Sequence, residues 1–244
     1  MRYAVIADIH ANLEAFSAIL ADIGRRGGVD EYWVLGDITG YGPDPHACIE
    51  LVRRLPGAVV AGNHDAAAVR RYPLHSFNPE AAAAVEWTEG HLSDGDIQYL
   101  RSLPATLELQ GFTLTHGSPR QPGREYISSI PTAGQIFEIM TTPHAMVGHT
   151  HQPAVFKREE SGAVVYIPFK PGIGLVVGKG RFIINPGSVG EPRDGDPRAS
   201  YAIYDNEATI IRLYRVSYDV GATQDRMISE NLPVRLAARL GRGQ

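Results

Sequence analysis

Five short motifs of metal-ligating residue types are spread along this chain of 244 residues. They are Asp8-Ile9-His10, Gly36-Asp37, Gly62-Asn63-His64-Asp65, His116 and Gly148-His149-Thr150-His151. Carboxylate, imidazole and amide groups without thiolate suit hard-to-borderline divalent cations. A single such aspartate at a strand end is usually a cap, and a lone histidine is usually satisfied by hydrogen bonds. The whole set, in this order, predicts a site for two divalent metal ions.

The spacing within the motifs favours convergence of the side chains. In an extended segment, residues i and i+2 point to the same side, so Asp8 and His10 can face one point, as can His149 and His151. A carboxylate such as Asp37 is a natural bridge, because its two oxygens can serve two ions. Two divalent ions outweigh the charge of two aspartates, so the site would attract phosphate anions and lower the pKa of a bound water.

The first third of the chain reads as alternating strands and helices. The predicted elements are a strand at 2–7, a helix capped by Asn12, a strand at 32–35, a helix at 45–54 and a strand at 58–61. Short connections imply parallel strands with helices packed on the sheet. Ligands gather beyond the carboxyl ends of such strands, where the first three motifs fall.

The rest of the chain divides into a helical stretch and a strand-rich half. Residues 66–103 read as mostly helical, either an insertion beside the site or an ordinary pair of surface helices. From residue 105 onward, Gly and Pro turns separate short strands. We expect these strands to form a second, largely antiparallel or mixed sheet packed on the first. The segment 219–240 reads as helical with a break at Pro233.

Composition is that of an ordinary globular protein. The net charge of −4 gives no reason to expect a general nucleic-acid or membrane surface. The only cysteine, Cys48, allows no intramolecular disulfide and favours a reducing compartment. The early Asp8 interrupts the first apolar run, which argues against a signal peptide, and no run approaches the ~20 apolar residues of a membrane span. We therefore expect a cytoplasmic protein.

The five motifs together resemble the calcineurin-like metallophosphoesterases. The segments Asn185-Pro186-Gly187-Ser188-Val189-Gly190 and Gly36-Asp37-Ile38-Thr39-Gly40-Tyr41-Gly42-Pro43 also resemble the small bacterial and archaeal phosphodiesterase branch. The resemblance covers nearly the whole chain. It implies one domain over 1–244 and an α/β fold: a four-layer α/β/β/α sandwich of two mixed sheets with flanking helices and a dinuclear metal site at one edge.

The resemblance also implies a role for each motif residue. Asp8, His10 and His151 would hold the first metal. Asn63, His116 and His149 would hold the second, and Asp37 would bridge the two. A metal-bridging hydroxide would attack phosphorus. His64 would stabilise the developing charge and assist the leaving group, while Asp65 would orient His64 or its loop.

Residues outside the motifs are weaker candidates. Four arginines near the motif loops could hold a phosphoryl group, and Arg120 and Arg193 are the two that we expect to bind substrate; the others are Arg124 and Arg198. Tyr41 and Tyr126 could stack on a base or aryl group, although packing is an equal alternative. We expect ordinary surface or loop positions for most of the remaining histidines, which are His46, His75, His91 and His144.

The chain is therefore expected to be a dinuclear metal-dependent hydrolase of phosphate esters, first of phosphodiesters. The alternatives are a dinucleoside polyphosphate hydrolase, a phosphomonoester or protein phosphatase and, remotely, a non-catalytic scaffold. Mn²⁺ is the ion that we expect to activate in an assay, with Fe, Zn²⁺, Co²⁺ and Ni²⁺ as alternatives. The expected partner is a small phosphorylated substrate, nucleotide-like if a diester. A homodimer is compatible with this branch.

Overall fold

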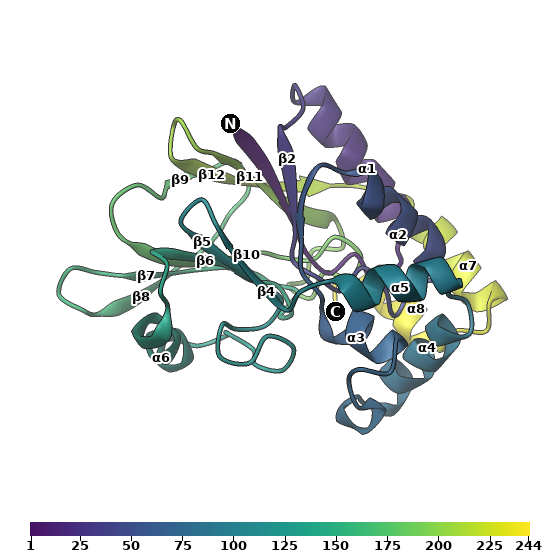
Figure 1. The fold of residues 1–244 in the computed structure, drawn as a ribbon. Coiled ribbons are helices and arrows are strands. Elements are labelled where there is room, and N and C mark those ends of the chain that lie inside the picture. Colours follow the sequence, from purple (N-terminus) through teal and green to yellow (C-terminus); the bar gives the residue numbers. More distant parts are fainter.

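A computed structural model describes residues 1–244 as two six-stranded mixed sheets. In spatial order, the first sheet contains β3 (Gly57–Val59), β2 (Glu31–Val34), β1 (Arg2–Ile6), β11 (Ala199–Asp205), β12 (Ile210–Val216) and β9 (Gly174–Val176). The second contains β4 (Thr106–Leu109), β5 (Phe112–Thr115), β6 (His144–Met146), β10 (Arg181–Pro186), β7 (Pro153–Arg158) and β8 (Val164–Ile167). Figure 1 shows the two sheets facing each other, with helices outside them. The predicted α/β sandwich of two mixed sheets is confirmed.

The helices cover the outer faces and one side of this sandwich (Figure 1). They are α1 (Leu13–Arg25), α2 (Pro45–Arg54), α3 (Asn63–Ala68), the 3₁₀ turn η1 (Leu74–Ser76), α4 (Pro79–Glu89), α5 (Asp94–Ser102), α6 (Ile130–Ile139), α7 (Val220–Ser229) and α8 (Val234–Leu240). The predicted cap of α1 is present, because the Asn12 side chain accepts a hydrogen bond from the Ala15 amide. The stretch 66–103 is mostly helical, and its standing as an insertion within one domain stays a prediction.

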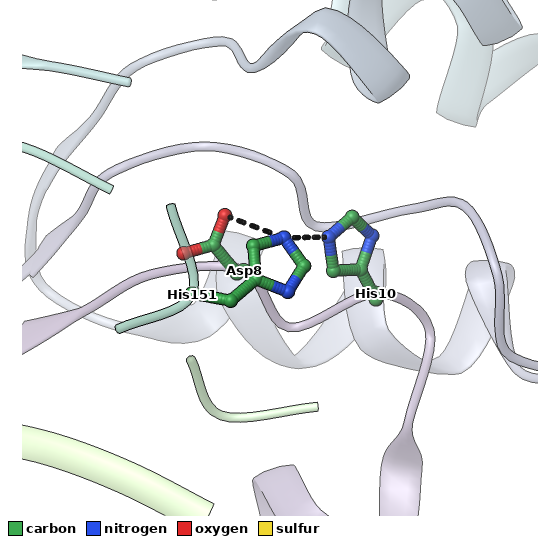
Figure 2. A group of neighbouring side chains, drawn as sticks. All are labelled: Asp8, His10 and His151. Carbon is green, nitrogen blue, oxygen red and sulfur yellow. Dashed lines mark hydrogen bonds and ion pairs between the residues drawn. The ribbon is translucent and has the colours of Figure 1, made fainter. Parts of the chain in front are cut away.

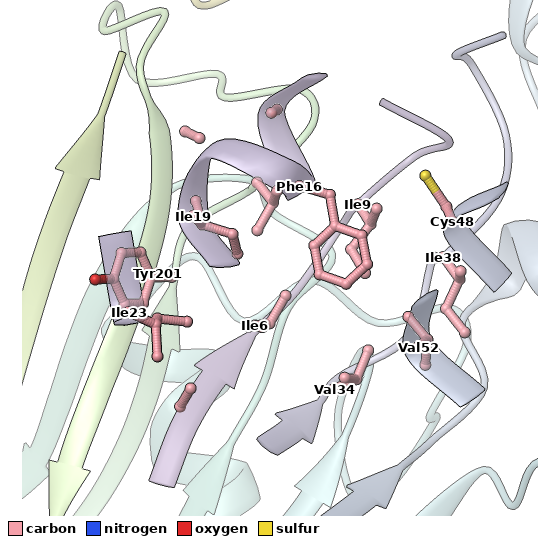
Figure 3. Close-up of a cluster of buried hydrophobic side chains, with 14 of the residues drawn as sticks. Ile6, Ile9, Phe16, Ile19, Ile23, Val34, Ile38, Cys48, Val52 and Tyr201 are labelled. Atoms are coloured by element: carbon pink, nitrogen blue, oxygen red, sulfur yellow. The ribbon is translucent and has the colours of Figure 1, made fainter. Parts of the chain in front are cut away.

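Strand β1 is apolar on both faces because it is covered on both sides. Ala4 and Ile6 belong to the core beneath α1, together with Phe16. Val5 belongs to the core between the two sheets, where it joins Trp33. Figure 3 shows the first of these cores, with Phe16 of α1 close to strand residue Ile6. Burying each of the larger apolar side chains, such as Val5, Ile6 and Phe16, contributes about 1.5–3 kcal/mol, so the central strands are firmly held.

The prediction for the second half was wrong in one respect: its strands do not all form the second sheet. β11 lies antiparallel beside β1, with Tyr3 opposite Tyr204, and β12 and β9 extend that same sheet. The cause is visible in β11, whose residues pack alternately under α1 and between the sheets. Such a doubly buried strand needs a central position. Apolar alternation does not reveal which sheet supplies that position.

Candidate metal centre

The loops after the strands bring the motif residues together. Asp8 follows β1, Asp37 follows β2, and Asn63 begins α3 after β3. From the second sheet, His116 directly follows β5, and the segment 149–151 follows β6. All seven expected ligands are buried, with between 0% and 7% of each residue exposed.

The backbone is left-handed rather than extended at five of the seven expected ligands. The φ angles are 55° at Asp8, 49° at His10, 52° at Asp37, 69° at His149 and 57° at His151. Asp8 and His10 do converge, but the predicted reason, an extended segment, is wrong. Non-glycine residues rarely adopt this region, and such strain concentrates at functional sites. The left-handed turns at 8–10 and 149–151 each bring two of the expected ligands to the centre.

Three of the histidines have a fixed proton position. His10 Nδ1 lies 3.0 Å from the Thr39 carbonyl, and His116 Nδ1 lies 2.9 Å from the Leu35 carbonyl. His151 Nδ1 lies 2.6 Å from the Glu191 carbonyl. Since a carbonyl only accepts, each Nδ1 must carry the proton and donate. The Nε2 atoms of these rings are therefore the ones that face the centre.

This assignment makes two lone pairs face each other. His10 Nε2 and His151 Nε2 are 3.1 Å apart, and burial lowers the pKa of both rings, which keeps them neutral. In Figure 2 the ring of His151 lies between His10 and the carboxylate of Asp8, whose Oδ1 is 3.5 Å from His151 Nε2. Nitrogen lone pairs at that separation repel unless a cation lies between them. The donor set of Asp8, His10 and His151 therefore fits a metal ion.

A second donor set lies beside the first and shares Asp37 with it. His116 Nε2 is 3.2 Å from Asp37 Oδ2, 3.0 Å from His149 Nδ1 and 3.1 Å from Asn63 Oδ1. Asp37 Oδ2 is also 3.6 Å from His10 Nε2 in the first set. Asp37 therefore lies between the two sets, where the sequence placed a bridging carboxylate.

Two carboxylate oxygens in the centre, Asp8 Oδ2 and Asp37 Oδ2, are buried and accept no hydrogen bond. Asp37 Oδ2 is 3.2 Å from His116 Nε2, with which it forms an ion pair when that ring is protonated. The other oxygens of these two carboxylates accept backbone N–H groups, from His149 at 3.1 Å and from His64 at 2.9 Å. An unpaired buried carboxylate oxygen is costly unless a cation binds it. These two oxygens therefore also fit bound divalent ions.

The ionisable groups of the centre strongly shift one another's pKa values. Burial and the neighbouring Asp37 raise the pKa of Asp8 to about 7. Burial alone would raise the pKa of Asp37 too, but His116 and His64 bring it well below its usual range. Burial would lower the pKa of His116, yet Asp37 and Asp8 raise it to about 9. A proton on His116 thus offsets part of the negative charge that a metal would offset when bound.

His64 faces the same cavity, and its partner is not Asp65. Asp65 Oδ1 accepts from the Thr39 amide and hydroxyl, each at 3.0 Å, while Oδ2 accepts from the Gly62 amide. Asp65 therefore ties the loop after Asp37 to the start of α3. His64 Nδ1 is buried without a partner, and burial lowers the pKa of this ring to about 4. His64 also lies close enough to His10 and Asp37 to form a third metal-competent group with them.

Gly40 is required for this arrangement. Its φ is +89°, and a Cβ there would lie 2.3 Å from His64 Nδ1. Glycine alone leaves room for the imidazole at a backbone angle that other residues rarely adopt.

A cavity of about 220 Å³ opens onto the centre. Its lining includes Asp37, His64, His149 and His151, so it reaches both donor sets. The remaining lining residues are Tyr41, Asn63, Tyr72, Ser76, Phe77, Asn78, Ala81, Arg124, Tyr126, Arg193 and Arg239. The helical stretch after α3 thus forms one wall of the site.

Of the four arginines considered from the sequence, two line the cavity and two lie outside it. Arg193 and Arg124 line the cavity, but Arg120 does not. Arg120 binds Glu125 instead and donates to Gln135 at 3.0 Å. Its sequence distance from His116 is short, but the loop turns back at Gly117, whose amide donates to the Pro122 carbonyl. Arg198 is also outside the cavity and pairs with Asp196.

The histidines outside the motifs take no part in the cavity. His46 pairs with Asp96 at 2.9 Å, and the ring of His91 stacks on Trp87 at 3.8 Å. His75 is an exposed residue of η1, whereas His144 is buried in β6 against Phe112. None of the four lines the cavity.

Several residues of the site were not foreseen from the sequence. Arg239 of α8, Glu191 after β10, and the aromatic pair Tyr72 and Phe77 all belong to it or support it. Tyr126, weighed as a stacking residue, lies 3.9 Å from the His149 ring in a stacked pair. Arg239 is far along the chain from every motif and carries no local signal of its position.

Comparison with known proteins agrees with this geometry. The model of the calcineurin-like phosphoesterase superfamily domain matches residues 1–209. The crystal structure of a metallophosphoesterase from Sphaerobacter thermophilus is 46% identical and covers 100% of this chain and 99% of its own, with a TM-score of 0.90. The uncharacterized protein MJ0912 of Methanocaldococcus jannaschii is 36% identical over 99% of this chain and 98% of its own length.

A shorter match involves an enzyme with a named substrate. A symmetrical bis(5'-nucleosyl)-tetraphosphatase of Pectobacterium carotovorum is 30% identical over 102 residues, which are 41% of this chain and 36% of that protein. Taken with the two sheets and the clustered His and Asp side chains, these findings place the chain among the metallophosphoesterases. It belongs to the calcineurin-like phosphoesterase superfamily.

One further finding bears on the chain as a whole. None of its helices has both the length and the apolar character that crossing a bilayer requires.

Proposed function

We propose that the protein hydrolyses phosphodiesters with the help of two divalent metal ions. The observation that carries the proposal is the pair of donor sets that share Asp37. His10 and His151 meet at 3.1 Å with both lone pairs inward, and His116 and His149 meet at 3.0 Å beside it. Asp8, His10 and His151 would hold one ion, and Asn63, His116 and His149 the other.

The ions would supply a water of lowered pKa and positive charge for the phosphoryl oxygens. Mn²⁺ is our choice for the assay, because mixed nitrogen and oxygen donors without thiolate accept it. The three Nδ1–H donations to backbone carbonyls hold the imidazoles in one orientation. These imidazoles therefore need little reorientation during the reaction.

His64 is the residue that we assign to the leaving group. Hydrolysis adds the oxygen of water to phosphorus and breaks one P–O ester bond, and the departing oxygen takes up a proton. His64 lines the cavity, and its lowered pKa keeps the ring neutral, so that it can donate a hydrogen bond without repelling the metals. Asp65 acts indirectly, by holding the two loops on which His64 and Asp37 stand.

A dinucleoside polyphosphate is the second candidate substrate. Arg124, Arg193 and Arg239 line the cavity, and so do Tyr72 and Phe77. Guanidinium groups suit further phosphoryl groups, and aromatic rings suit a base. The partial similarity to the bis(5'-nucleosyl)-tetraphosphatase supports the same idea. A phosphomonoesterase is a third candidate. A non-catalytic scaffold would not need two complete donor sets. The cytoplasmic location stays a prediction.

The test is side-by-side hydrolysis of an aryl phosphodiester and the matching monoester with added Mn²⁺. We expect faster cleavage of the diester, and loss of that activity in Asp37→Asn. Faster cleavage of the monoester would place a phosphatase first. Two bound metals with no cleavage of either ester would point to a narrower substrate. No bound metal and no cleavage would overturn the proposal.

A further inference from the structure

Two arginines from distant parts of the chain meet on one buried carboxylate beside the metal centre. Glu191 is 1% exposed. Its Oε2 accepts from Arg193 Nη2 at 2.6 Å and from Arg193 Nε at 3.2 Å. Its Oε1 accepts from Arg239 Nε at 2.7 Å and also from Arg239 Nη2. We call Arg193, Glu191 and Arg239 the arginine cluster.

The arginine cluster keeps an uncompensated positive charge. One carboxylate, that of Glu191, accepts hydrogen bonds from two guanidinium groups, so the cluster has one more positive charge than negative charge. The Arg193 side chain is 26% exposed and that of Arg239 is 25% exposed. Both line the cavity, so the remaining charge is available to a ligand there.

The arginine cluster also has unused hydrogen-bond donors. A guanidinium has five N–H groups. Arg193 gives two to Glu191 and one to the Tyr41 hydroxyl at 3.2 Å, which leaves both Nη1 protons free. Arg239 gives two to Glu191 and keeps three without a protein acceptor. The cluster thus offers five N–H donors without a protein acceptor, and the non-bridging oxygens of a phosphoryl group can each accept more than one of them.

The arginine cluster is adjacent to the metal centre but separate from its ligands. Glu191 contacts His151 through both its carbonyl and its carboxylate. The Tyr41 ring lies 4.5 Å from the rings of His10 and His64, and the Arg239 guanidinium lies over the same Tyr41 ring, 4.8 Å from its centroid. An anion on the arginines would thus be one side chain away from an anion on the metals.

We propose that the arginine cluster is a second anion subsite, which binds a phosphoryl group contiguous with the one that is cleaved. This inference rests on the proposed function of the metal centre and names a substrate class for it: esters of a diphosphate or longer chain. A simple diester carries one negative charge, which leaves the combined positive charge of two ions and the arginine cluster unmatched. A second phosphoryl group supplies the missing charge and fills the free donors.

The test compares two chromogenic esters with the full-length protein in Mn²⁺. One is the 4-nitrophenyl ester of thymidine 5′-monophosphate, and the other is the 4-nitrophenyl ester of thymidine 5′-diphosphate. We expect kcat/KM to be about tenfold higher for the diphosphate ester, and this ratio to fall to near one in Arg239→Ala. An equal ratio in the wild type and the variant would overturn the proposal.

Two further variants separate binding from folding. Arg239→Gln removes the charge but still donates to Glu191, so it should lose the same preference even if Arg239→Ala is unstable. Arg235→Ala is the matched control, because Arg235 is on the same helix, 85% exposed, and 3.5 Å from Glu80 rather than in the cavity. It should keep the wild-type ratio, and a comparable loss there would count against a specific role for Arg239.

A binding experiment keeps the inference testable if the proposed function fails. If neither ester is cleaved, calorimetry would compare thymidine 5′-diphosphate with thymidine 5′-monophosphate. We expect the diphosphate to bind about tenfold more tightly to the wild type, and the advantage to disappear in Arg239→Gln. Equal affinities in the wild type would refute the second anion subsite without bearing on the metal ligands.

Discussion

Two charged clusters share one cavity, and the chain builds them in different ways. The metal centre comes from short motifs at the ends of strands, and five of its residues have left-handed backbone angles. The arginine cluster comes from the loop after β10 and from α8, and it is held by one buried carboxylate. The first cluster gathers negative and neutral donors for cations, whereas the second gathers cations for an anion. On our proposals, the metal centre performs the chemistry and the arginine cluster selects the substrate.

The strongest way to test this division is to remove the carboxylate shared by the two donor sets. Asp37→Asn leaves the size of the side chain unchanged but removes the charge between the metals. We expect kcat/KM to fall by about 10²–10³-fold or more, because a fixed charge at the reacting centre is lost. Steady-state kinetics with metal analysis of the same sample measures both effects. Activity within a few-fold of the wild type would show that Asp37 is not central.

A second substitution distinguishes a residue that assists from one that binds metal. His64→Gln should lower kcat by about 10²-fold, because a hydrogen-bond donor or acid to the leaving oxygen is displaced. Metal content should be unchanged, since both donor sets are complete without His64. Loss of a metal ion in this variant would instead make His64 a ligand, in line with its closeness to His10 and Asp37.

The arginine cluster should matter to stability as well as to selection. Glu191→Gln removes the charge that holds Arg193 and Arg239, and we expect the free energy of unfolding to fall by about 1.5–3 kcal/mol. Urea unfolding measures this change. Glu207→Gln is the control, because Glu207 is 88% exposed in its pair with the N-terminus and should change stability by less than about 0.5 kcal/mol. Equal effects in the two variants would argue against the arginine cluster.

A third ionic cluster, remote from the cavity, should affect stability alone. Asp22 accepts from Arg26 and from the Tyr201 hydroxyl, each at 2.7 Å. Burial opposes its ionisation, but these hydrogen bonds lower its pKa. The stabilisation is therefore present above the unfolded pKa of about 4 and is lost as the pH falls through the lower folded pKa. Asp22→Asn should cost about 1.5–3 kcal/mol at pH 7.

The pH dependence of that variant is the check. The difference in unfolding free energy between Asp22→Asn and the wild type should shrink as the pH is lowered below about 4, while kcat/KM at pH 7 stays at the wild-type value. A difference that is independent of pH would mean that packing, and not the carboxylate charge, stabilises this cluster.

The sequence predicted the elements and motifs well because their causes are local. The Asn12 cap was readable from a few neighbouring residues, and the Ser93–Asp96 capping box and the hairpin around Gly111 have equally local causes. The motif residues also converge as expected, although left-handed turns rather than extended segments bring them together. Those turns leave no clear mark in the residue types, since Asp and His adopt them at a cost that the site imposes.

Other features depend on contacts between distant residues. β11 joins the first sheet because a doubly buried strand must be central, which its composition alone cannot specify. Arg239 reaches the cavity only because α8 packs on α7 and α4 through Leu236 and Leu240. Arg120, which is close to His116 in sequence, turns away to Glu125. Sequence proximity thus favoured an arginine that lies outside the cavity, and tertiary packing brings to it one that no motif indicated.

The central claim is that Asp37 lies between two metal ions, and anomalous diffraction tests it most directly. Crystals of the full-length protein would be soaked in Mn²⁺ and measured at wavelengths on either side of the manganese absorption edge. The account predicts two anomalous peaks, both adjacent to the Asp37 carboxylate, one beside His10 and His151 and the other beside His116 and His149. A single peak, or none at Asp37, would contradict the dinuclear centre.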